Sequence, residues 1–300
     1  MNSETAKVLV ESACNEWGPI EYIALREAKV AFDSDRRISR QWRPLRFHSQ
    51  PEFDVADEEY QSFEALIRAT GSNVILLEGH EVLTLDSIYP RDALIVAPQG
   101  LVLCEMGRPS RSNEPKLNAA ELVSLGFPVL GEISRPGTLE GGDFIWLDER
   151  HAAVGSGPRT NQEGISQLRY LLGNDIDLHV VPLPEPEHPE DVFHLMSMIS
   201  PLDQDLALIY RPLMSEDFMT WLISLGIAFV EVPEEEYLPM GCNVLATGPR
   251  QVIMLDRLPE TKRRLEQAGC SVTTYKGDEI SRKGEGGPTC LTRPLVRRRS

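Results

Sequence analysis

A single thiol, Cys290, follows the stretch Gly286-Gly287-Pro288-Thr289 near the C-terminal end of the chain. Two adjacent glycines let backbone approach closely where a side chain would obstruct, and the proline stiffens the chain before the thiol. A loop that presents one cysteine in this way is typical of a nucleophile. The alternative is a glycine-rich turn around a small buried residue, since most free cysteines behave as hydrophobes.

Four other polar loops carry residue types that could act with such a thiol, namely Asp92, Glu140, His194 and Asn243. Each is weak evidence alone, because a lone histidine is more often structural and an acid beside two glycines is by default a turn residue. Their position along the chain makes them stronger candidates. All four, like Cys290, lie at the same place within a repeated unit.

The repeated unit is a helix that ends at a glycine and is followed by a strand. Apolar residues at helical spacing precede five glycines, which are Gly71, Gly126, Gly173, Gly226 and Gly269. Glycine is the expected left-handed stop of a helix. Short apolar runs after these stops predict strands at 73–77, 128–130, 177–181, 228–232 and 271–275. The unit therefore recurs about every fifty residues.

Hairpins follow the polar loops, because apolar pairs flank turn residues at 93–104 and at 243–255. The fifth unit lacks its last strand where the chain ends. An early strand, Ile20–Leu25, is expected to fill that gap and to remove an exposed sheet edge. The sequence thus predicts a single α/β domain over residues 1–300, built as a closed, five-fold pseudosymmetric ring. In such a ring the five polar loops converge at one mouth of a central channel.

The net charge and the arrangement of the cysteines limit the classes of partner and site that we expect. The net charge of -16 and the pI near 4.9 disfavour nucleic acid and membranes as partners and favour a small cationic substrate. Five scattered cysteines without a CxxC pair predict neither a disulfide framework nor a cysteine-rich zinc site. Residues Met1–Lys7 lead into Val8 without a basic, apolar leader, so we expect a cytoplasmic protein. A homo-oligomer is compatible with the sequence.

Three motifs, in this order, carry a resemblance to a known family: Leu139-Glu140-Gly141-Gly142-Asp143, His194-Leu195 and Gly286-Gly287-Pro288-Thr289-Cys290. They resemble the guanidino-modifying enzymes, a superfamily of arginine deiminases, dimethylarginine dimethylaminohydrolases and amidinotransferases. The resemblance covers the chain from about residue 70 to its end. It implies that the ring is the five-bladed α/β propeller, or pentein fold, of that superfamily.

The resemblance also implies residue roles. Cys290 matches the family nucleophile, His194 the general acid and base, and Glu140 the carboxylate beside them. The substrate-binding positions would be Asp92 for the guanidinium, Arg111 and Arg159 for the α-carboxylate, and Asp86 near the amino-acid end, with Asn243 placed by the repeat. For the two arginines, a surface ion pair is the alternative interpretation.

The chemistry of a guanidinium suits these residue types. Its carbon is a poor electrophile, so carboxylates such as Asp92 and Glu140 must fix its plane and polarise it. A cysteine has an ordinary pKa of ~8.5, which a bound cation lowers, so the substrate can help to generate the thiolate. His194 would protonate the departing amine and then activate water. No metal or organic cofactor is expected, although Cys290, His194, Glu140 and Asp92 leave a zinc site open as an alternative.

Residues next to the predicted site match two different subfamilies. Arginine deiminases have an aspartate two residues after the histidine, where this chain has Met196, as in the dimethylarginine hydrolases. Conversely, Arg91 before Asp92 resembles the deiminases. We expect hydrolysis of an N-substituted, for example methylated, arginine. The alternatives are an arginine deiminase or dihydrolase, an amidinotransferase that passes the amidino group to an amine, and a non-catalytic propeller.

Overall fold

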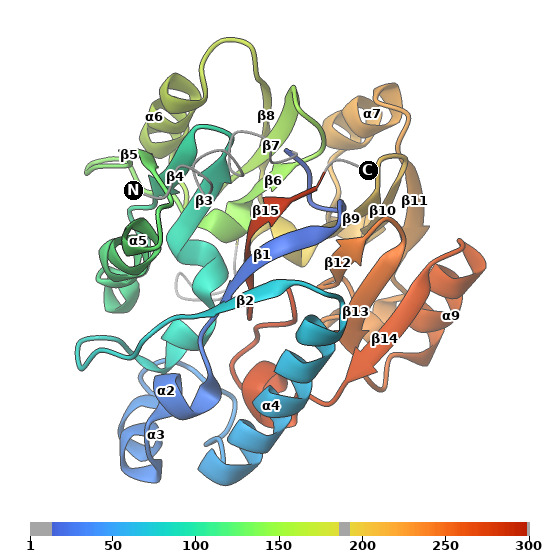
Figure 1. Cartoon of the computed structure of the whole chain (residues 1–300). Coiled ribbons are helices and arrows are strands. Elements are labelled where there is room, and N and C mark those ends of the chain that lie inside the picture. The colour runs from blue at the N-terminus through green and yellow to red at the C-terminus, as the bar shows by residue number, and fades with distance from the viewer. Residues whose placement is uncertain (1–13, 186–192, 299–300) are drawn as a thin grey trace.

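A computed structural model describes residues 14–185 and 193–298 (Figure 1). Residues Met1–Lys7, on which the expectation about a leader depends, lie outside the described residues, as do Asp191 and Val192 of the third polar loop, which carries His194. The described strands form five sheets of three strands each. In every sheet the first strand is antiparallel to the second, and the third is parallel to the second.

Four of these blades are continuous in sequence, each with a helix between its second and third strands. The first contains β3 (Leu94–Ala97), β4 (Gly100–Leu103), α5 (Glu114–Ser124) and β5 (Val129–Glu132). The next contains β6 (Phe144–Trp146), β7 (His151–Ser156), α6 (Gln162–Leu172) and β8 (Asp177–Pro182). Then follow β9 (Ile199–Asp203), β10 (Leu206–Ile209), α7 (Glu216–Ser224) and β11 (Ala228–Glu231). The last contains β12 (Leu245–Gly248), β13 (Gln251–Leu255), α9 (Pro259–Gln267) and β14 (Ser271–Tyr275).

The fifth blade joins the two ends of the chain and closes the ring. Strand β15 (Arg293–Arg297) is antiparallel to β1 (Ile20–Leu25), with Ile23 opposite Pro294. Strand β1 is in turn parallel to β2 (Asn73–Leu76), and helix α4 (Phe53–Ala69) connects these two strands. In Figure 1 the blue β1 and the red β15 lie side by side. The predicted closure of the ring by the strand at 20–25 is therefore confirmed.

The glycine stops explain where the helices end. Gly71, Gly126, Gly173, Gly226 and Gly269 have φ values of 85°, 100°, 85°, 80° and 86°. A residue with a side chain adopts this left-handed conformation at a cost, whereas glycine does not. Each stop thus turns the chain from a peripheral helix into the third strand of a blade, and the five predicted helix–strand units are confirmed.

Within residues 14–52, two helices precede α4, namely α2 (Ala28–Phe32) and α3 (Asp35–Gln41). An arginine-rich run at 36–46 contributes most of α3 and lies at the surface. Its first part is helical because the Ser34 side chain caps the helix through the Arg37 N–H and Ile38 is buried beneath it. A further short helix, α8 (Glu234–Tyr237), follows β11. Among the described residues, no helix combines the length and the apolar character needed to span a membrane.

Candidate active site

The loop before the first strand of each blade carries one of the predicted site residues. Asp92 precedes β3, Glu140 precedes β6, His194 precedes β9, Asn243 precedes β12 and Cys290 precedes β15. The equivalent positions inferred from the repeat are therefore equivalent in the structure. Because the blades form a ring, these five loops are brought together although they span almost two hundred residues of sequence.

His194 and Glu140 form a buried pair. His194 Nε2 lies 2.8 Å from Glu140 Oε2, and His194 Nδ1 lies 3.9 Å from Asp92 Oδ1. Burial opposes a charged imidazole, but the carboxylates of Asp92, Asp143 and Glu140 outweigh it and raise the pKa of His194 to about 9. Burial likewise opposes the Glu140 carboxylate, yet His194 and Arg159 hold its pKa at about 2. The pair is therefore an imidazolium and a carboxylate at neutral pH.

Asp143 positions this histidine. Its Oδ1 accepts a hydrogen bond from the Leu195 N–H at 2.9 Å, and its Oδ2 accepts one from the Thr160 hydroxyl at 2.6 Å. Gly142 makes the close approach of these loops feasible, because a Cβ there would lie 2.6 Å from Asp92 Oδ1 and 2.8 Å from His194 Nδ1. The Gly-Gly-Asp sequence thus acts as more than a turn: it lets the histidine pack against the carboxylates and fixes the loop that carries it.

Cys290 is half-buried and contacts Asn243. The Asn243 Nδ2 lies 3.1 Å from the Cys290 sulfur, and the Asn243 Oδ1 accepts from the Thr289 N–H at 3.1 Å. A Cβ at Gly287 would lie 2.6 Å from the Asn243 side chain, so glycine is needed for this approach. Burial and the Asp92 carboxylate raise the pKa of the thiol to about 11, against the opposing effects of Asn243 and Arg91. The cysteine is therefore a thiol at neutral pH.

The two predicted carboxylate-binding arginines are buried, which rules out the surface ion pair. Arg111 and Arg159 are each 5% exposed. Arg111 donates to Asp92 Oδ2 at 2.5 Å and to Glu114, while Arg159 Nη1 lies 3.4 Å from Glu140 Oε1. Both arginines thus lie directly behind the carboxylates that face the histidine.

Asp86, predicted near the amino-acid end of the substrate, pairs with a residue that the sequence analysis missed. Arg108 Nη1 lies 3.1 Å from Asp86 Oδ2, and Arg108 Nη2 donates to the Leu45 carbonyl at 2.7 Å. The backbone N–H of Arg108 also donates to Glu140 Oε1 at 3.0 Å. A second arginine three residues before Arg111 was the available signal in the sequence.

Arg91 is the other missed residue. Its side chain is buried, with Nη2 2.7 Å from Glu16 Oε2 and Nε 3.3 Å from the sulfur of Met196. Its Nη1 has no hydrogen-bond partner among the described residues. In the sequence, Arg91 only distinguishes between subfamilies, whereas in the structure its guanidinium lies beside Met196 and near Cys290.

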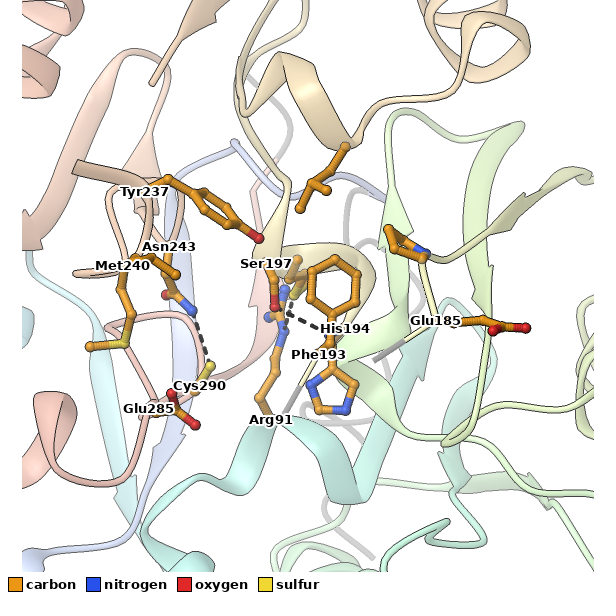
Figure 2. Close-up of a pocket in the computed structure, with 15 residues that line it drawn as sticks. Arg91, Glu185, Phe193, His194, Ser197, Tyr237, Met240, Asn243, Glu285 and Cys290 are labelled. Carbon is orange, nitrogen blue, oxygen red and sulfur yellow. Dashed lines mark hydrogen bonds between the residues drawn. The ribbon is translucent and has the colours of Figure 1, made fainter. Parts of the chain in front are cut away.

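A cavity of about 430 Å³ opens next to the thiol (Figure 2). Cys290, His194 and Asn243 line it, together with Arg91 and Met196. The other predicted site residues, Asp86, Asp92, Arg111, Glu140 and Arg159, do not line it. The predicted site residues are therefore brought together, but in two layers: a layer that faces the cavity and a buried layer of ion pairs behind it.

By distance alone, three of these groups could hold a metal ion. One ligand atom each from Asp92, Glu140 and His194 lies within 4.8 Å of the others, and Cys290 is not part of this group. Glu140 and His194 are bonded to each other and Asp92 to Arg111, so the ligand atoms have protein partners. The zinc alternative drawn from four residues including the thiol does not match this geometry, and metal analysis of the purified protein tests it.

Comparison with known proteins places the chain among enzymes of guanidino groups. Among curated proteins, the dimethylarginine dimethylaminohydrolase of Streptomyces coelicolor is 28% identical over 239 residues, which are 77% of this chain and 84% of that protein. The arginine deiminase of Mycobacterium marinum is 31% identical over 247 residues, which are 70% of this chain. The chain spans 60% of the length of that deiminase.

Solved structures agree with the fold. The dimethylarginine dimethylaminohydrolase of Pseudomonas aeruginosa matches with a TM-score of 0.74 and 23% identity, over 93% of this chain and 99% of that one. An amidinotransferase of Microseira wollei matches with a TM-score of 0.79 and 16% identity, over 97% and 98% of the two chains. The predicted five-bladed propeller is thus confirmed.

The family model described as N,N dimethylarginine dimethylhydrolase, eukaryotic, matches residues 32–297, which is most of the chain. This range includes every predicted site residue, from Asp86 to Cys290. The C–N hydrolase class predicted from the motifs is confirmed, and the chain belongs to the N,N dimethylarginine dimethylhydrolase family.

Proposed function

We propose that the protein hydrolyses the guanidinium C–N bond of an N-substituted arginine through a covalent intermediate on Cys290. One observation carries the proposal: Cys290 and His194 line the same cavity, and Glu140 holds His194 Nε2 at 2.8 Å. A nucleophile beside an oriented acid–base group is the arrangement that covalent catalysis requires. Membership of the family supports the same class of reaction.

The guanidinium would bind between the two layers of the site. Asp92 Oδ1 is buried and has no hydrogen-bond partner among the described residues. A buried acceptor left unpaired costs ~1–3 kcal/mol, so a substrate N–H that supplies this bond is favoured. Arg111 and Arg159 lie behind Asp92 and Glu140 and would attract the α-carboxylate, and Asp86 would attract the α-amino group by exchanging its contact with Arg108.

The first chemical step is attack by Cys290. The bound cation would lower the raised pKa of the thiol, as a positive charge favours the thiolate. The sulfur adds to the guanidinium carbon, and the C–N bond to the substituted nitrogen breaks. His194, which is an imidazolium at neutral pH, donates its proton to the departing amine. The product of this step is an amidino-thioether on Cys290.

The second step returns the enzyme to its starting state. The neutral His194 removes a proton from water, which attacks the amidino carbon, and the C–S bond breaks to release a urea, here citrulline. His194 is thereby reprotonated. Glu140 keeps the imidazole in place throughout, and Asp143 fixes the loop from behind.

The position of Met196 supports the proposal that the substrate is an N-substituted arginine. It is 4% exposed and lines the cavity that contains Cys290. A thioether makes no demand for an N–H donor, whereas an aspartate at this position would lose a partner when the nitrogen is alkylated. The test is incubation with arginine, monomethylarginine and dimethylarginine while ammonia, methylamines, citrulline and ornithine are measured. Citrulline with a methylamine is expected.

Arginine deiminase or dihydrolase activity is the second candidate, and Arg91 is the observation that favours it. Arg91 Nε lies 3.3 Å from the Met196 sulfur, so the positive charge of Arg91 lies close to the place where the N-substituent of the substrate would bind. Release of ammonia from unsubstituted arginine at a higher kcat/KM than release of methylamines would favour this candidate. An amidinotransferase is distinguished by product analysis with and without glycine or ornithine as acceptor.

A further inference from the structure

We propose that the cavity beside Cys290 binds the departing amine and that it fits an amine with an apolar substituent much larger than methyl. The inference rests on the proposed function and refines its substrate class. A volume of about 430 Å³ lies in the range of pockets that hold drug-sized ligands, ~300–1,000 Å³. Methylamine, with two non-hydrogen atoms, would leave most of this volume to water.

The walls of the cavity are apolar and come from three blades. The apolar side chains that line it are Pro184, Phe193, Met196, Leu213, Tyr237, Leu238 and Met240. Leu238, which follows Tyr237 in the chain, lines the cavity although it is 88% exposed. Tyr237 stacks on Tyr210 with the ring centroids 3.7 Å apart, so this wall is held in place from behind. Apolar surface of this kind beside a nucleophile marks a ligand site.

Polar groups also line parts of the cavity. They include Cys290, His194 and Asn243, where the chemistry would occur, and the nearby side chains of Arg91 and Ser197 (Figure 2). Glu185 and Glu285 are exposed, and their carboxylates would attract a cationic guanidinium to the opening. The rest of the lining is largely apolar, which suits an alkyl or aryl group better than a second charged group.

The position of the arginines decides which part of the substrate enters the cavity. Arg111 bonds to Asp92 and Arg159 contacts Glu140, and neither arginine lines the cavity. Asp92 and Glu140 contact the His194 ring, which does line it.

An amino-acid end attracted by the arginines therefore lies on one side of the catalytic groups, and the cavity lies on the other. The nitrogen that leaves, with whatever it carries, points into the cavity.

The experiment compares Nω-methyl-, Nω-propyl-, Nω-hexyl- and Nω-benzylarginine, with citrulline and the free amine measured for each. Wild-type kcat/KM is expected to rise about threefold to fourfold for each methylene that is buried, which is the ordinary gain for apolar burial. Leu213→Trp fills the cavity at a half-buried position outside the catalytic groups. It is expected to remove the gain for hexyl and benzyl substrates while methylarginine is still hydrolysed.

Leu125→Trp, at an exposed leucine just after α5, is the matched control and should leave the whole series unchanged. Equal or falling kcat/KM from methyl to hexyl in the wild type overturns the inference and leaves the proposed function standing. If none of the arginines releases an amine, the proposed function fails. In that case, a second assay tests whether the cavity binds an apolar group, by measuring whether benzylguanidine protects Cys290 from alkylation by iodoacetamide. Protection is expected in the wild type and not in Leu213→Trp. Absence of protection in the wild type also overturns the inference.

Discussion

Asn243 Nδ2 lies 3.1 Å from the Cys290 sulfur, while the other end of the same amide accepts from the Thr289 N–H, also at 3.1 Å. Asn243 precedes β12 and Cys290 precedes β15, so the contact joins two blades that are adjacent in the ring. A hydrogen bond to a charged acceptor is stronger than one to a neutral acceptor, so this amide favours the thiolate over the thiol. The pair links the geometry of the fold directly to the ionisation of the Cys290 thiol.

Asn243→Asp should therefore slow the reaction without changing the shape of the site. It replaces a donor to the sulfur by a negative charge, which raises the pKa of Cys290 further. Loss of a hydrogen bond to a charged group costs ~1.5–3 kcal/mol, so kcat/KM at neutral pH should fall about tenfold to a hundredfold. Iodoacetamide alkylation of Cys290 should slow in parallel. Asn73→Asp, on the exposed strand β2, is the control and should change neither rate.

Cys290→Ser should abolish turnover and leave the fold intact. A serine hydroxyl has no base strong enough to ionise it here, whereas a thiol can be ionised by a bound cation. The thermal unfolding midpoint should stay within a few degrees of wild type, since the residue is half-buried and the change is nearly isosteric. Residual turnover above about a hundredth of the wild-type kcat would contradict a covalent mechanism.

The pH dependence should show a rising limb at neutral pH. The reactive form needs Cys290 deprotonated, with a pKa of about 11, and His194 protonated, with a pKa of about 9. Raising the pH below the His194 pKa creates thiolate without removing the imidazolium, so kcat/KM should rise about tenfold per pH unit. Above the His194 pKa, each further pH unit creates more Cys290 thiolate but removes imidazolium in the same proportion, so the profile should level off. A profile that is flat or falling through neutral pH would show that the thiolate already exists in the free enzyme.

Arg111→Ala and Arg159→Ala should differ, because the two arginines have different partners. Arg111 bonds to Asp92 and Glu114, and both carboxylates are buried. Removing one partner from a buried ion pair costs ~3–5 kcal/mol, so Arg111→Ala should destabilise the fold in a denaturant titration.

Arg159→Ala is the cleaner test of substrate binding. If Arg159 attracts the α-carboxylate, its loss should lower kcat/KM for arginine substrates by a factor that corresponds to about 2–5 kcal/mol of lost transition-state stabilisation. The kcat/KM for carboxylate-free guanidines should change much less. Equal losses for both kinds of substrate would show that Arg159 acts only by holding Glu140, which it contacts at 3.4 Å.

Met196→Asp should move the preference toward unsubstituted arginine. The new carboxylate would lie beside Arg91, whose Nη1 has no partner among the described residues, so it would be paired when no substrate is bound. It would also accept from a second guanidinium N–H, which an alkylated nitrogen lacks. The ratio of kcat/KM for arginine to that for dimethylarginine should rise about tenfold or more. An unchanged ratio with a lower Tm would mean that Met196 only packs the core.

Local signals in the sequence were enough to predict the blades. A left-handed glycine after a helix and a short apolar strand after that glycine are set by neighbouring residues, so they are visible at Gly71 and again at Gly269. The closing role of β1 also followed from the sequence, because a ring with one strand missing and one strand in excess has a single way to close. The order of the Glu140, His194 and Cys290 motifs pointed to the family for the same reason: each motif is a short, continuous stretch.

The partners of the side chains could not be predicted, because they depend on contacts between distant parts of the chain. Arg91 pairs with Glu16, 75 residues away, and Arg108 reaches the carbonyl of Leu45, 63 residues away. Nothing in the local pattern distinguishes an arginine that faces a ligand from one that is buried against a carboxylate. The sequence by itself determined the ring, the motifs and the class of reaction. Only the packing of five blades around one centre decided that Arg111 and Arg159 contact the Asp92 and Glu140 carboxylates and that a largely apolar cavity lies beside Cys290. Both features depend on how side chains from separate blades fill the same space.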